Sequence, residues 1–387
     1  MNEETLNKLL TIPKRNGLFK EIVNEFRGVN NIEKLKHREF NTKDGIVPVI
    51  TLGNEVKSND VKVIKIFIAA QHNEYNGLFG ILEFFKELIK GELKVEDYLK
   101  NDQILFFFPL MNPYGFLNPN NENKSGYFLK NGKNLNRFWR RTFAPEYKNN
   151  EVDLDNINMP EQTYIVKSIL EKYWVKKRIK LYFMDFHETS LLERYMLKLS
   201  RNLNSESYTY KFTHWIEERI IYNIIKLYNI QYSSTPLFKK CSTSINHSHL
   251  NLSAKQIELV YEKLLEYIVL NIRKLPFYFC HSNNTDEYCV NLAQKVYNKL
   301  KDKLWETRFL TFDHNFQDHG CFIKMSDATT RNHVYAMELE SQKQFFNIFK
   351  EIEKTKTQSN YFEEKLNDIN ISIELVKSTI IEMIHLV

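Results

Sequence analysis

The spacing of apolar and polar residues divides the first part of the chain into strands and one amphipathic helix. Residues 47–52 and 61–70 read as strands, the second because β-branched and apolar residues dominate it. Apolar side chains recur at helical spacing over residues 76–90, which predicts a helix with one buried face. Residues 103–110 are almost wholly apolar, which is typical of a strand buried on both faces.

Helices and strands continue in alternation through the rest of the chain. The pattern predicts helices over residues 162–176, 210–228, 254–272 and 287–304, and strands over residues 179–186, 307–312 and 334–339. The polar segment 115–159 reads as a long loop, and the tail from Gln342 on is helical. This order predicts an α/β fold: a central mixed, largely parallel sheet with helices on both faces, plus a helical C-terminal extension. We expect one large domain over residues 1–341 and the extension over residues 342–387.

Composition narrows the class of protein. A chain of 387 residues with 43% hydrophobic and 26% charged residues can bury a large core. Its 54 basic and 48 acidic residues give a net charge of +6, and the basic residues are dispersed, which favours a solvated surface over a nucleic-acid-binding arm. A small acidic substrate would still be attracted to such a surface. The acidic N-terminus and the absence of a long apolar run predict a cytoplasmic protein with no membrane partner. The four cysteines show no CxxC pairing and read as free thiols, and no feature indicates an oligomeric state.

Polar residues follow directly on the predicted strand 61–70, at the edge where open α/β sheets place their sites. Gln71 and Glu74 are three residues apart, and in a forming helical turn both point the same way and reach one ion. His72 is two residues from Glu74 and tends to point away from it. The alternative for Glu74 is a carboxylate that favours a helix N-terminus.

Two further segments carry candidate chemistry. His187 closes a buried strand, where it is either a zinc ligand whose tautomer Asp185 fixes or a hydrogen-bonded edge histidine. In the long loop, the sequence Asn136-Arg137 offers a planar fork and an amide for a substrate carboxylate.

A carboxylate at the end of the last predicted strand completes the set. Glu338 would accept a proton from a water that zinc activates. Glu340, two residues on and on the same face of the strand, is its rival. An ordinary glutamate at a strand end is the alternative for both.

The order of these motifs resembles that of the zinc carboxypeptidase family, which includes the aspartoacylase and succinylglutamate desuccinylase deacylases. The motifs are a pair with x-x spacing after a strand, Asn-Pro-x-Gly after the next strand, x-Leu-Asn-Arg, Asp-x-His-Glu and a late strand glutamate, spread over residues 47–341. The resemblance implies a Zn²⁺ cofactor with Glu74 and His187 as ligands and Gln71 in the place of the first ligand. It also implies that Asn136 and Arg137 bind the substrate carboxylate and that Glu338 is the general base. Asn112, Pro113 and Gly115 would shape the turn below the site.

Two positions depart from that family. Gln71 stands where the family has its first histidine, and a neutral amide oxygen is a poorer zinc donor than imidazole. A shift of register that makes His72 the ligand is the alternative. The family also carries an arginine upstream of the Asn-Arg pair; here Tyr127 matches that position, as a substrate-binding residue, with Lys130 and Lys133 close by.

The sequence thus predicts a zinc-dependent, metallocarboxypeptidase-like hydrolase. It would cleave an amide bond next to a substrate carboxylate, in a peptide or an N-acyl amino acid with a free carboxylate, by metal-activated water and a glutamate base. Two alternatives stay open: a zinc-dependent deacylase of N-acyl amino acids, and a catalytically impaired relative that binds a peptide or a partner protein.

Overall fold

The computed structural model describes residues 1–53, 61–120, 123, 126–143, 159–174, 179–189, 209–210, 233–236, 248–251, 255, 259, 278–282, 287–300, 302–303, 310–311, 334–342 and 359–386. Its helices are α1 (Glu3–Leu10), η1 (Ile12–Lys14), α2 (Arg15–Gly28), η2 (Val29–Asn31), α3 (Asn76–Lys90), α4 (Val95–Tyr98), α5 (Pro113–Leu117), η4 (Leu135–Arg137), α6 (Trp139–Phe143), α7 (Glu161–Trp174), α11 (Glu287–Leu300) and α13 (Ser359–His385). Its strands are β1 (Leu35–Thr42), β2 (Gly45–Leu52), β3 (Val63–Ala69), β4 (Gln103–Phe108), β5 (Lys180–Thr189), β6 (Thr209–Tyr210), β7 (Ser233–Pro236), β8 (Ser248–Asn251), β9 (Tyr278–Ser282), β10 (Leu310–Thr311) and β11 (Val334–Gln342).

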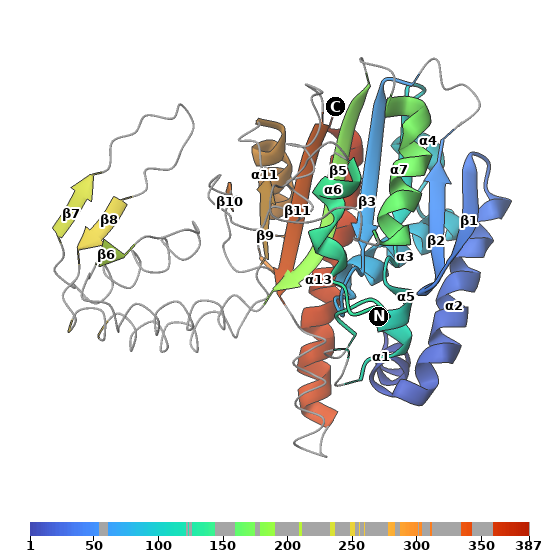
Figure 1. Ribbon diagram of the computed structural model, residues 1–387, viewed down its shortest axis with the longest axis horizontal. Coiled ribbons are helices and arrows are strands. Elements are labelled where there is room, and N and C mark those ends of the chain that lie inside the picture. Colours follow the sequence, from blue (N-terminus) through green and yellow to red (C-terminus); the bar gives the residue numbers. More distant parts are fainter. Residues whose placement is uncertain are drawn as a thin grey trace.

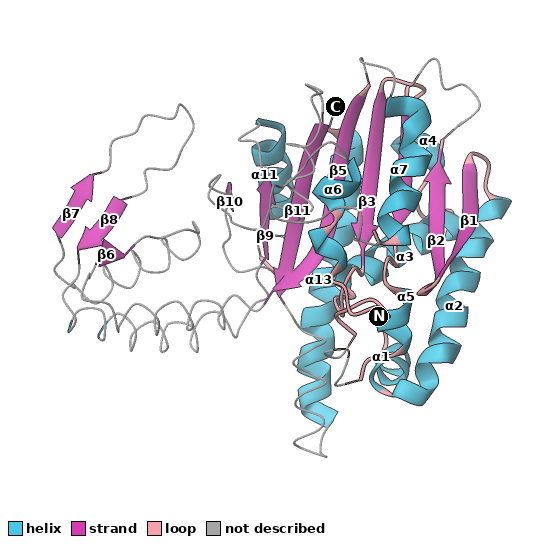
Figure 2. Ribbon diagram, viewed as in Figure 1, coloured by secondary structure: helices cyan, strands magenta, loops and turns pink. Residues whose placement is uncertain are grey.

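One mixed sheet organises the described part of the chain (Figures 1 and 2). Its strand order is β1-β2-β4-β3-β5-β11-β9-β10. The central strands β4, β3, β5 and β11 run parallel to one another. The strands β1 and β2 pair antiparallel with their neighbours, and β9 pairs antiparallel with β11 and parallel with β10. A separate three-stranded sheet has the order β6-β8-β7.

Helices cover both faces of the large sheet. On one face α1, α2, α3, α11 and α13 contribute to a single hydrophobic cluster with side chains of β3, β4, β5 and β11. On the other face α6 and α7 pack over a second cluster with the opposite-facing side chains of the same strands. The predicted fold class, a mixed and largely parallel sheet with helices on both faces, is therefore confirmed.

Close approach between α3 and the sheet depends on a glycine. A Cβ atom at Gly77 would lie 2.8 Å from the Cβ of Ala69 and closer still to that of Phe186. The first turn of α3 is thereby held directly against the ends of β3 and β5. This contact matters because the polar residues 71–74 connect β3 to α3.

The predicted elements agree in part with the described ones, and the differences are as follows. The predicted loop 115–159 contains η4 and α6, and α5 begins before it: Asn112 caps α5 by accepting a hydrogen bond from the Gly115 amide at 2.8 Å, and Pro113 occupies its first turn. Tyr210 lies in β6 rather than in a helix. The elements not predicted include α1, α2, β1, α4, β7, β8 and β9. Gln342, where the helical tail was predicted to begin, is the last residue of β11. The rest of the predicted helix 210–228, most of the predicted helix 254–272, and most of the predicted strand 307–312 lie outside the described residues.

The C-terminal helix α13 packs against α3 and contributes Ile373, Val376 and Ile380 to the first hydrophobic cluster. The boundary at residue 341 stays a prediction. Among the described helices, none combines the length and the apolar character that crossing a bilayer requires.

Candidate metal centre

The polar residues of the predicted site meet at the carboxyl edge of the parallel strands β3, β5 and β11. Residues 71–74 follow β3, while Asp185 and His187 lie at the end of β5. In the register of β5 and β11, Glu338 pairs with Asp185 and Glu340 with His187. Because side chains alternate along a strand, these four residues share the face covered by α6.

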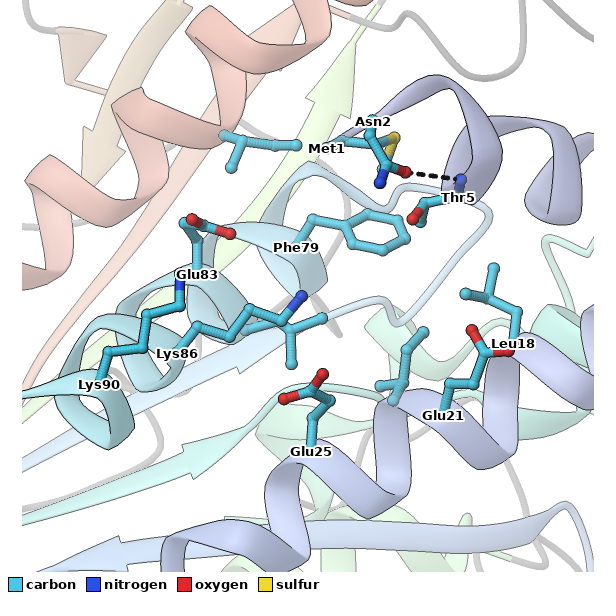
Figure 3. A pocket seen from close by; sticks show the side chains of 13 residues that line it. Met1, Asn2, Thr5, Leu18, Glu21, Glu25, Phe79, Glu83, Lys86 and Lys90 are labelled. Carbon is cyan, nitrogen blue, oxygen red and sulfur yellow. Dashed lines mark hydrogen bonds between the residues drawn. The ribbon is translucent and has the colours of Figure 1, made fainter.

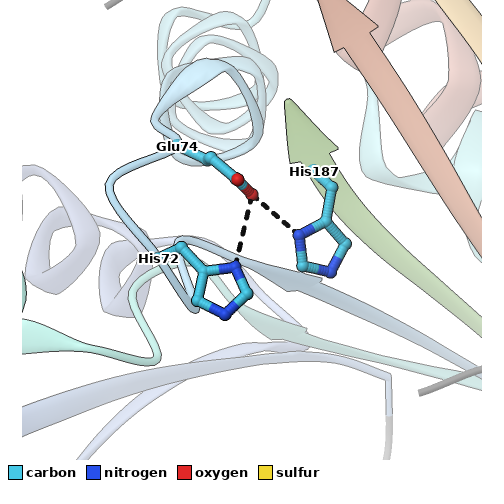
Figure 4. A group of neighbouring side chains, drawn as sticks. All are labelled: His72, Glu74 and His187. Atoms are coloured by element: carbon cyan, nitrogen blue, oxygen red, sulfur yellow. Dashed lines mark hydrogen bonds and ion pairs between the residues drawn. The ribbon is translucent and has the colours of Figure 1, made fainter. Parts of the chain in front are cut away.

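His72, Glu74 and His187 form one buried group (Figure 4). The Oε2 atom of Glu74 lies 2.7 Å from Nδ1 of His187 and 3.6 Å from Nδ1 of His72. The three side chains come from two segments that are more than a hundred residues apart. All three are nearly inaccessible, with 4 to 6% of the residue surface exposed.

The outer nitrogen of each ring contacts an oxygen. Nε2 of His72 lies 2.9 Å from Oδ1 of Asn134, and Nε2 of His187 lies 2.7 Å from Oδ2 of Asp185. The amide of Asn134 is oriented by the backbone N–H of Asn136, which donates to the same Oδ1. Both Nε2 atoms therefore act as donors, which leaves both Nδ1 atoms directed at Glu74.

This donor set fits a zinc ion. Catalytic zinc sites use three protein ligands drawn from imidazole nitrogen and carboxylate oxygen, and the histidines donate their other N–H to an oxygen. His72, Glu74 and His187 offer one ligand atom each, all within 4.8 Å of one another. A second grouping, of Asp185, His187 and Glu338, meets the same distance limit. The first grouping has two imidazoles and one carboxylate, a combination known from catalytic zinc sites, so it is the better fit.

The carboxyl groups and the imidazole of His187 shift one another's pKa values. Burial opposes charge on Glu74, but the neighbouring His187 and His72 outweigh it and hold the pKa of Glu74 well below its usual range. Burial likewise opposes charge on His187, whereas Asp185 and Glu74 together raise its pKa well above the usual value. For Asp185 burial is the stronger influence, and it raises the pKa of that carboxyl against the effect of His187.

Gln71, the predicted first ligand, lies beside this group but not in it. Its amide oxygen accepts a hydrogen bond from Nε1 of Trp139 at 2.8 Å, and its amide nitrogen donates to Oδ2 of Asp185. His72 instead lies beside Glu74, although the two were expected to point apart. Helical spacing does not apply here, because α3 begins only at Asn76 and residues 71–73 form bends.

Two features fix the backbone between β3 and α3: one backbone conformation and one pair of hydrogen bonds. Ala70 adopts a left-handed conformation with φ of 52°, which ends the strand abruptly. Glu188, immediately after His187, then accepts hydrogen bonds from the backbone amides of Tyr75 at 2.7 Å and Asn76 at 2.9 Å. The backbone next to Glu74 is thereby tied to the backbone next to His187.

The turn after β4 supports the same connection. The side-chain amide of Asn112 donates to the carbonyl of Gln71 at 3.3 Å and to that of Phe128 at 3.1 Å. A Cβ atom at Gly115 would overlap the carbonyl oxygen of Gly126. The Asn-Pro-Tyr-Gly turn thus joins the segment after β3 to the loop that covers the site.

Glu338, the predicted base, is buried at this edge with 5% of its surface exposed. Burial raises its pKa to about 7, with the negative charges of Asp185 and Glu340 adding to the effect and His187 opposing it. The Asn136 amide donates to its Oε1 at 3.5 Å. Glu340 is also buried, at 7%, so exposure does not distinguish the two carboxylates.

The loop that ends in η4 brings the predicted substrate-binding residues to the site. Asn136 is buried, and its amide nitrogen lies 3.3 Å from Nε2 of His187. Arg137 is exposed, and its guanidinium donates to the Asn136 carbonyl at 3.1 Å. The Tyr127 ring stacks on His72 with centroids 4.0 Å apart and planes inclined by 6°, and its hydroxyl receives a hydrogen bond from Asn134. Contact of these residues with a substrate stays a prediction.

Sequence reasoning missed Asn134, Trp139 and Glu188. Glu188 ends the Asp-x-His-Glu motif and Asn134 begins the x-Leu-Asn-Arg motif, but neither was assigned a role, so membership of a motif was a usable signal for both. Trp139 lies two residues after Arg137, in a stretch predicted as loop, and only the fold brings its indole to Gln71.

A cavity of about 310 Å³ lies elsewhere, between α1, α2, α3 and α13 (Figure 3). Glu21, Glu25, Glu83, Lys86 and Lys90 contribute its charged lining. None of the residues of the candidate metal centre lines it.

No protein-family model and no curated protein matches the chain. Among solved structures, it is similar to the metallo-carboxypeptidase from Pseudomonas aeruginosa in complex with (2-guanidinoethylmercapto)succinic acid, with 12% identity, a TM-score of 0.47, and coverage of 96% of this chain and 68% of that one. The metallo-carboxypeptidase from Burkholderia cenocepacia has 13% identity and a TM-score of 0.44, with 92% and 68% of the two chains covered. Bovine thrombin-activatable fibrinolysis inhibitor, in complex with tick carboxypeptidase inhibitor, has 11% identity and a TM-score of 0.44, with 95% of each chain covered. Because these identities and TM-scores are low, conclusions about the site rest on its side chains.

Proposed function

We propose that this protein is a zinc-dependent hydrolase of the metallocarboxypeptidase type, which cleaves an amide bond next to a substrate carboxylate. One observation carries the proposal. The Nδ1 atoms of His72 and His187 both face the Glu74 carboxylate, while both Nε2 atoms donate to oxygens outside the group. When the rings are neutral, as metal binding requires, only the inner nitrogens have lone pairs, and they converge on one position with a carboxylate oxygen.

His72, Glu74 and His187 would hold the zinc ion, with His72 taking the place expected for Gln71. Bound zinc supplies Lewis-acid chemistry: it polarises a carbonyl oxygen and lowers the pKa of water. Zinc is the metal that this combination of two imidazoles and one carboxylate favours.

Glu338 would move the proton. Its carboxylate accepts the proton of the attacking water and delivers it to the leaving amine nitrogen, so that the departing group leaves as a neutral amine. A carboxyl group whose pKa is raised to about 7 can both accept and release a proton near neutral pH.

Asn136 and Arg137 would hold the substrate's free carboxylate. Guanidinium and carboxylate match in a planar, two-bonded geometry, and the exposed Arg137 can reach an incoming ligand. Asn136, buried between His187 and Glu338, would orient the substrate next to the bond that breaks.

Metal analysis and a pair of glutamate variants test this proposal. We expect purified protein to bind near-stoichiometric zinc and to hydrolyse peptides with a free C-terminal carboxylate faster than the same peptides with an amidated C-terminus. Glu338→Gln should lower kcat by about 100-fold or more with zinc still bound, because removal of a general base typically costs that much. Glu340→Gln is the matched control and should retain most of the activity.

Three other results would each point to a different conclusion. Loss of activity in Glu340→Gln but not in Glu338→Gln moves the base to Glu340. Hydrolysis of N-acyl amino acids without hydrolysis of peptides identifies the deacylase. Protein that binds no zinc and hydrolyses neither class of substrate overturns the proposed function in favour of a binding protein.

A further inference from the structure

The side-chain amide of Gln71 forms hydrogen bonds with two buried side chains. It has 1% of its surface exposed, and Trp139 and Asp185 have none. Nε1 of Trp139 donates to its Oε1 at 2.8 Å, and its Nε2 donates to Oδ2 of Asp185. The amide therefore connects an indole on α6 to a carboxylate on β5.

The chemistry of the two neighbours leaves one orientation for this amide. An indole N–H only donates, so the atom that faces Trp139 is the amide oxygen. The amide nitrogen then faces Asp185, which accepts. Turning the oxygen of Gln71 towards a metal ion would break both hydrogen bonds and leave a buried indole N–H without its acceptor, which is costly.

The carboxylate of Asp185 depends on this amide. Its Oδ2 atom takes the hydrogen bonds of both Gln71 and His187, whereas Oδ1 accepts none from the described residues. Both donors therefore act on one oxygen, and they determine how the carboxylate is turned. That orientation in turn directs Nε2 of His187 outward and Nδ1 towards Glu74.

We infer that Gln71 is a positioning residue of the metal centre and not one of its ligands. Trp139 orients Gln71, Gln71 orients Asp185, and Asp185 orients His187. The inference rests on the proposed function, because it assigns a role towards the metal that His72, Glu74 and His187 would hold.

Zinc affinity, measured by competition with a chromogenic chelator, tests the inference. Gln71→Met keeps the size of the side chain but removes both hydrogen bonds, and Trp139→Phe removes only the indole donor. We expect each to weaken zinc binding by about 10- to 100-fold, as loss of such outer partners does. If the two act in series, the double variant should lose little more than Gln71→Met alone.

A matched control is available in Gln162, another buried glutamine that donates to an aspartate, Asp44, at 3.0 Å but far from the metal centre. Gln162→Met should leave zinc affinity unchanged. If Gln71 were a ligand, Gln71→Met would weaken zinc binding while Trp139→Phe would not, since the freed amide oxygen would then bind the metal better. That pair of results overturns the inference.

A measurement on metal-free protein separates this inference from the proposed function. The indole N–H signal of Trp139, identified by its loss in Trp139→Phe, should show slow hydrogen exchange in the wild type and faster exchange in Gln71→Met. An unchanged exchange rate overturns the inference even if the wild type binds zinc. A wild type that binds no zinc, with the indole still protected by Gln71, overturns the proposed function instead.

Discussion

At the scale of single residues, the candidate site depends on which atom of each ring faces inward. Asn134 decides this for His72, because its Oδ1 atom accepts from Nε2 of the ring and from the backbone amide of Asn136. Its other amide atom donates to the hydroxyl of Tyr127, whose ring stacks on His72. One asparagine thus connects a proposed ligand to the loop that carries the proposed substrate-binding residues.

Replacing Asn134 should therefore weaken metal binding without touching a ligand. Asn134→Ala removes the acceptor for Nε2 of His72, and we expect zinc affinity to fall by about 10- to 100-fold. Asn134→Asp keeps an acceptor at that position and should retain most of the affinity. Competition with a chelator measures both.

Asn131 provides the control for this change. It lies in the same loop, and its side chain also accepts a backbone amide, that of Lys133, but it does not contact the metal centre. Asn131→Ala should leave zinc affinity unchanged. Equal zinc affinity in Asn134→Ala and the wild type would contradict the role proposed for His72.

At the scale of elements, the start of α3 is held by a carboxylate from β5. The first amides of a helix have no partner within the helix, and the positive end of its dipole favours an anion there. Glu188 satisfies the amides of Tyr75 and Asn76 at once, with only 4% of its own surface exposed. The element that follows Glu74 is thereby attached to the strand that carries His187.

Loss of this carboxylate should destabilise the fold as well as the site. Glu188→Ala leaves two buried amides without an acceptor, and we expect the free energy of unfolding to fall by about 1–3 kcal/mol. Glu188→Gln keeps an acceptor oxygen and should lose less. Chemical denaturation followed by fluorescence measures these differences.

Glu161, in the first turn of α7, is the comparison for Glu188. Its carboxylate accepts the backbone amide of Lys43 in an exposed setting, where water can replace it. Glu161→Ala should change the free energy of unfolding by less than about 0.5 kcal/mol. A larger effect at Glu161 than at Glu188 would show that burial is not the reason for the difference.

At the scale of the whole molecule, a buried lysine forms hydrogen bonds that connect the C-terminal helix to the central sheet. Lys65, in the middle of β3, donates from Nζ to the carbonyls of Met383 and Ile384 at 2.7 and 2.8 Å and of Leu386 at 2.8 Å. The last carbonyls of a helix have no partner within it and carry the negative end of the dipole. The lysine therefore links the C-terminal end of α13 to β3, a strand more than three hundred residues earlier in the chain.

Burial lowers the pKa of Lys65 to about 7, with Lys100 adding to the effect and Asp102 opposing it. An unfolded lysine titrates near pH 10.4, so between about pH 7 and pH 10 the unfolded chain binds more protons at this residue than the folded one. The contribution of Lys65 to stability should then rise with pH across that window and stay at its lowest below about pH 7. The difference in free energy of unfolding between the wild type and Lys65→Met, followed against pH, checks the sign.

Lys62 serves as the control for this series, because it precedes the same strand but is exposed. Lys62→Met should differ from the wild type by less than about 0.5 kcal/mol at each pH of the series, as exposed substitutions do. A wild-type advantage over Lys65→Met that shrinks as the pH rises would show that the three carbonyls keep Lys65 charged.

Much of this molecule follows from the sequence alone. Periodicity identifies the central strands and α3, because strands buried on both faces need continuous apolar runs and a helix packed on a sheet needs one apolar stripe. The order of the motifs places Glu74, His187 and Glu338 at one edge, because parallel strands bring their carboxyl ends together. The short helices α5 and α6 escape such reasoning, since five residues show too little periodicity. The N-terminal elements were not predicted either, although α2 is 14 residues long.

Only the tertiary structure distinguishes the surroundings of Gln71 from those of His72. The two are neighbours after a strand, and local spacing rules fail where Ala70 turns left-handed and the helix has not yet begun. What separates them is the partners that distant segments supply: an indole from α6 and a carboxylate from β5 engage the glutamine, while an amide from the loop before η4 directs the histidine. The sequence determined which residue types meet at this edge, and the packing of elements far apart in the chain determined which atoms face one another.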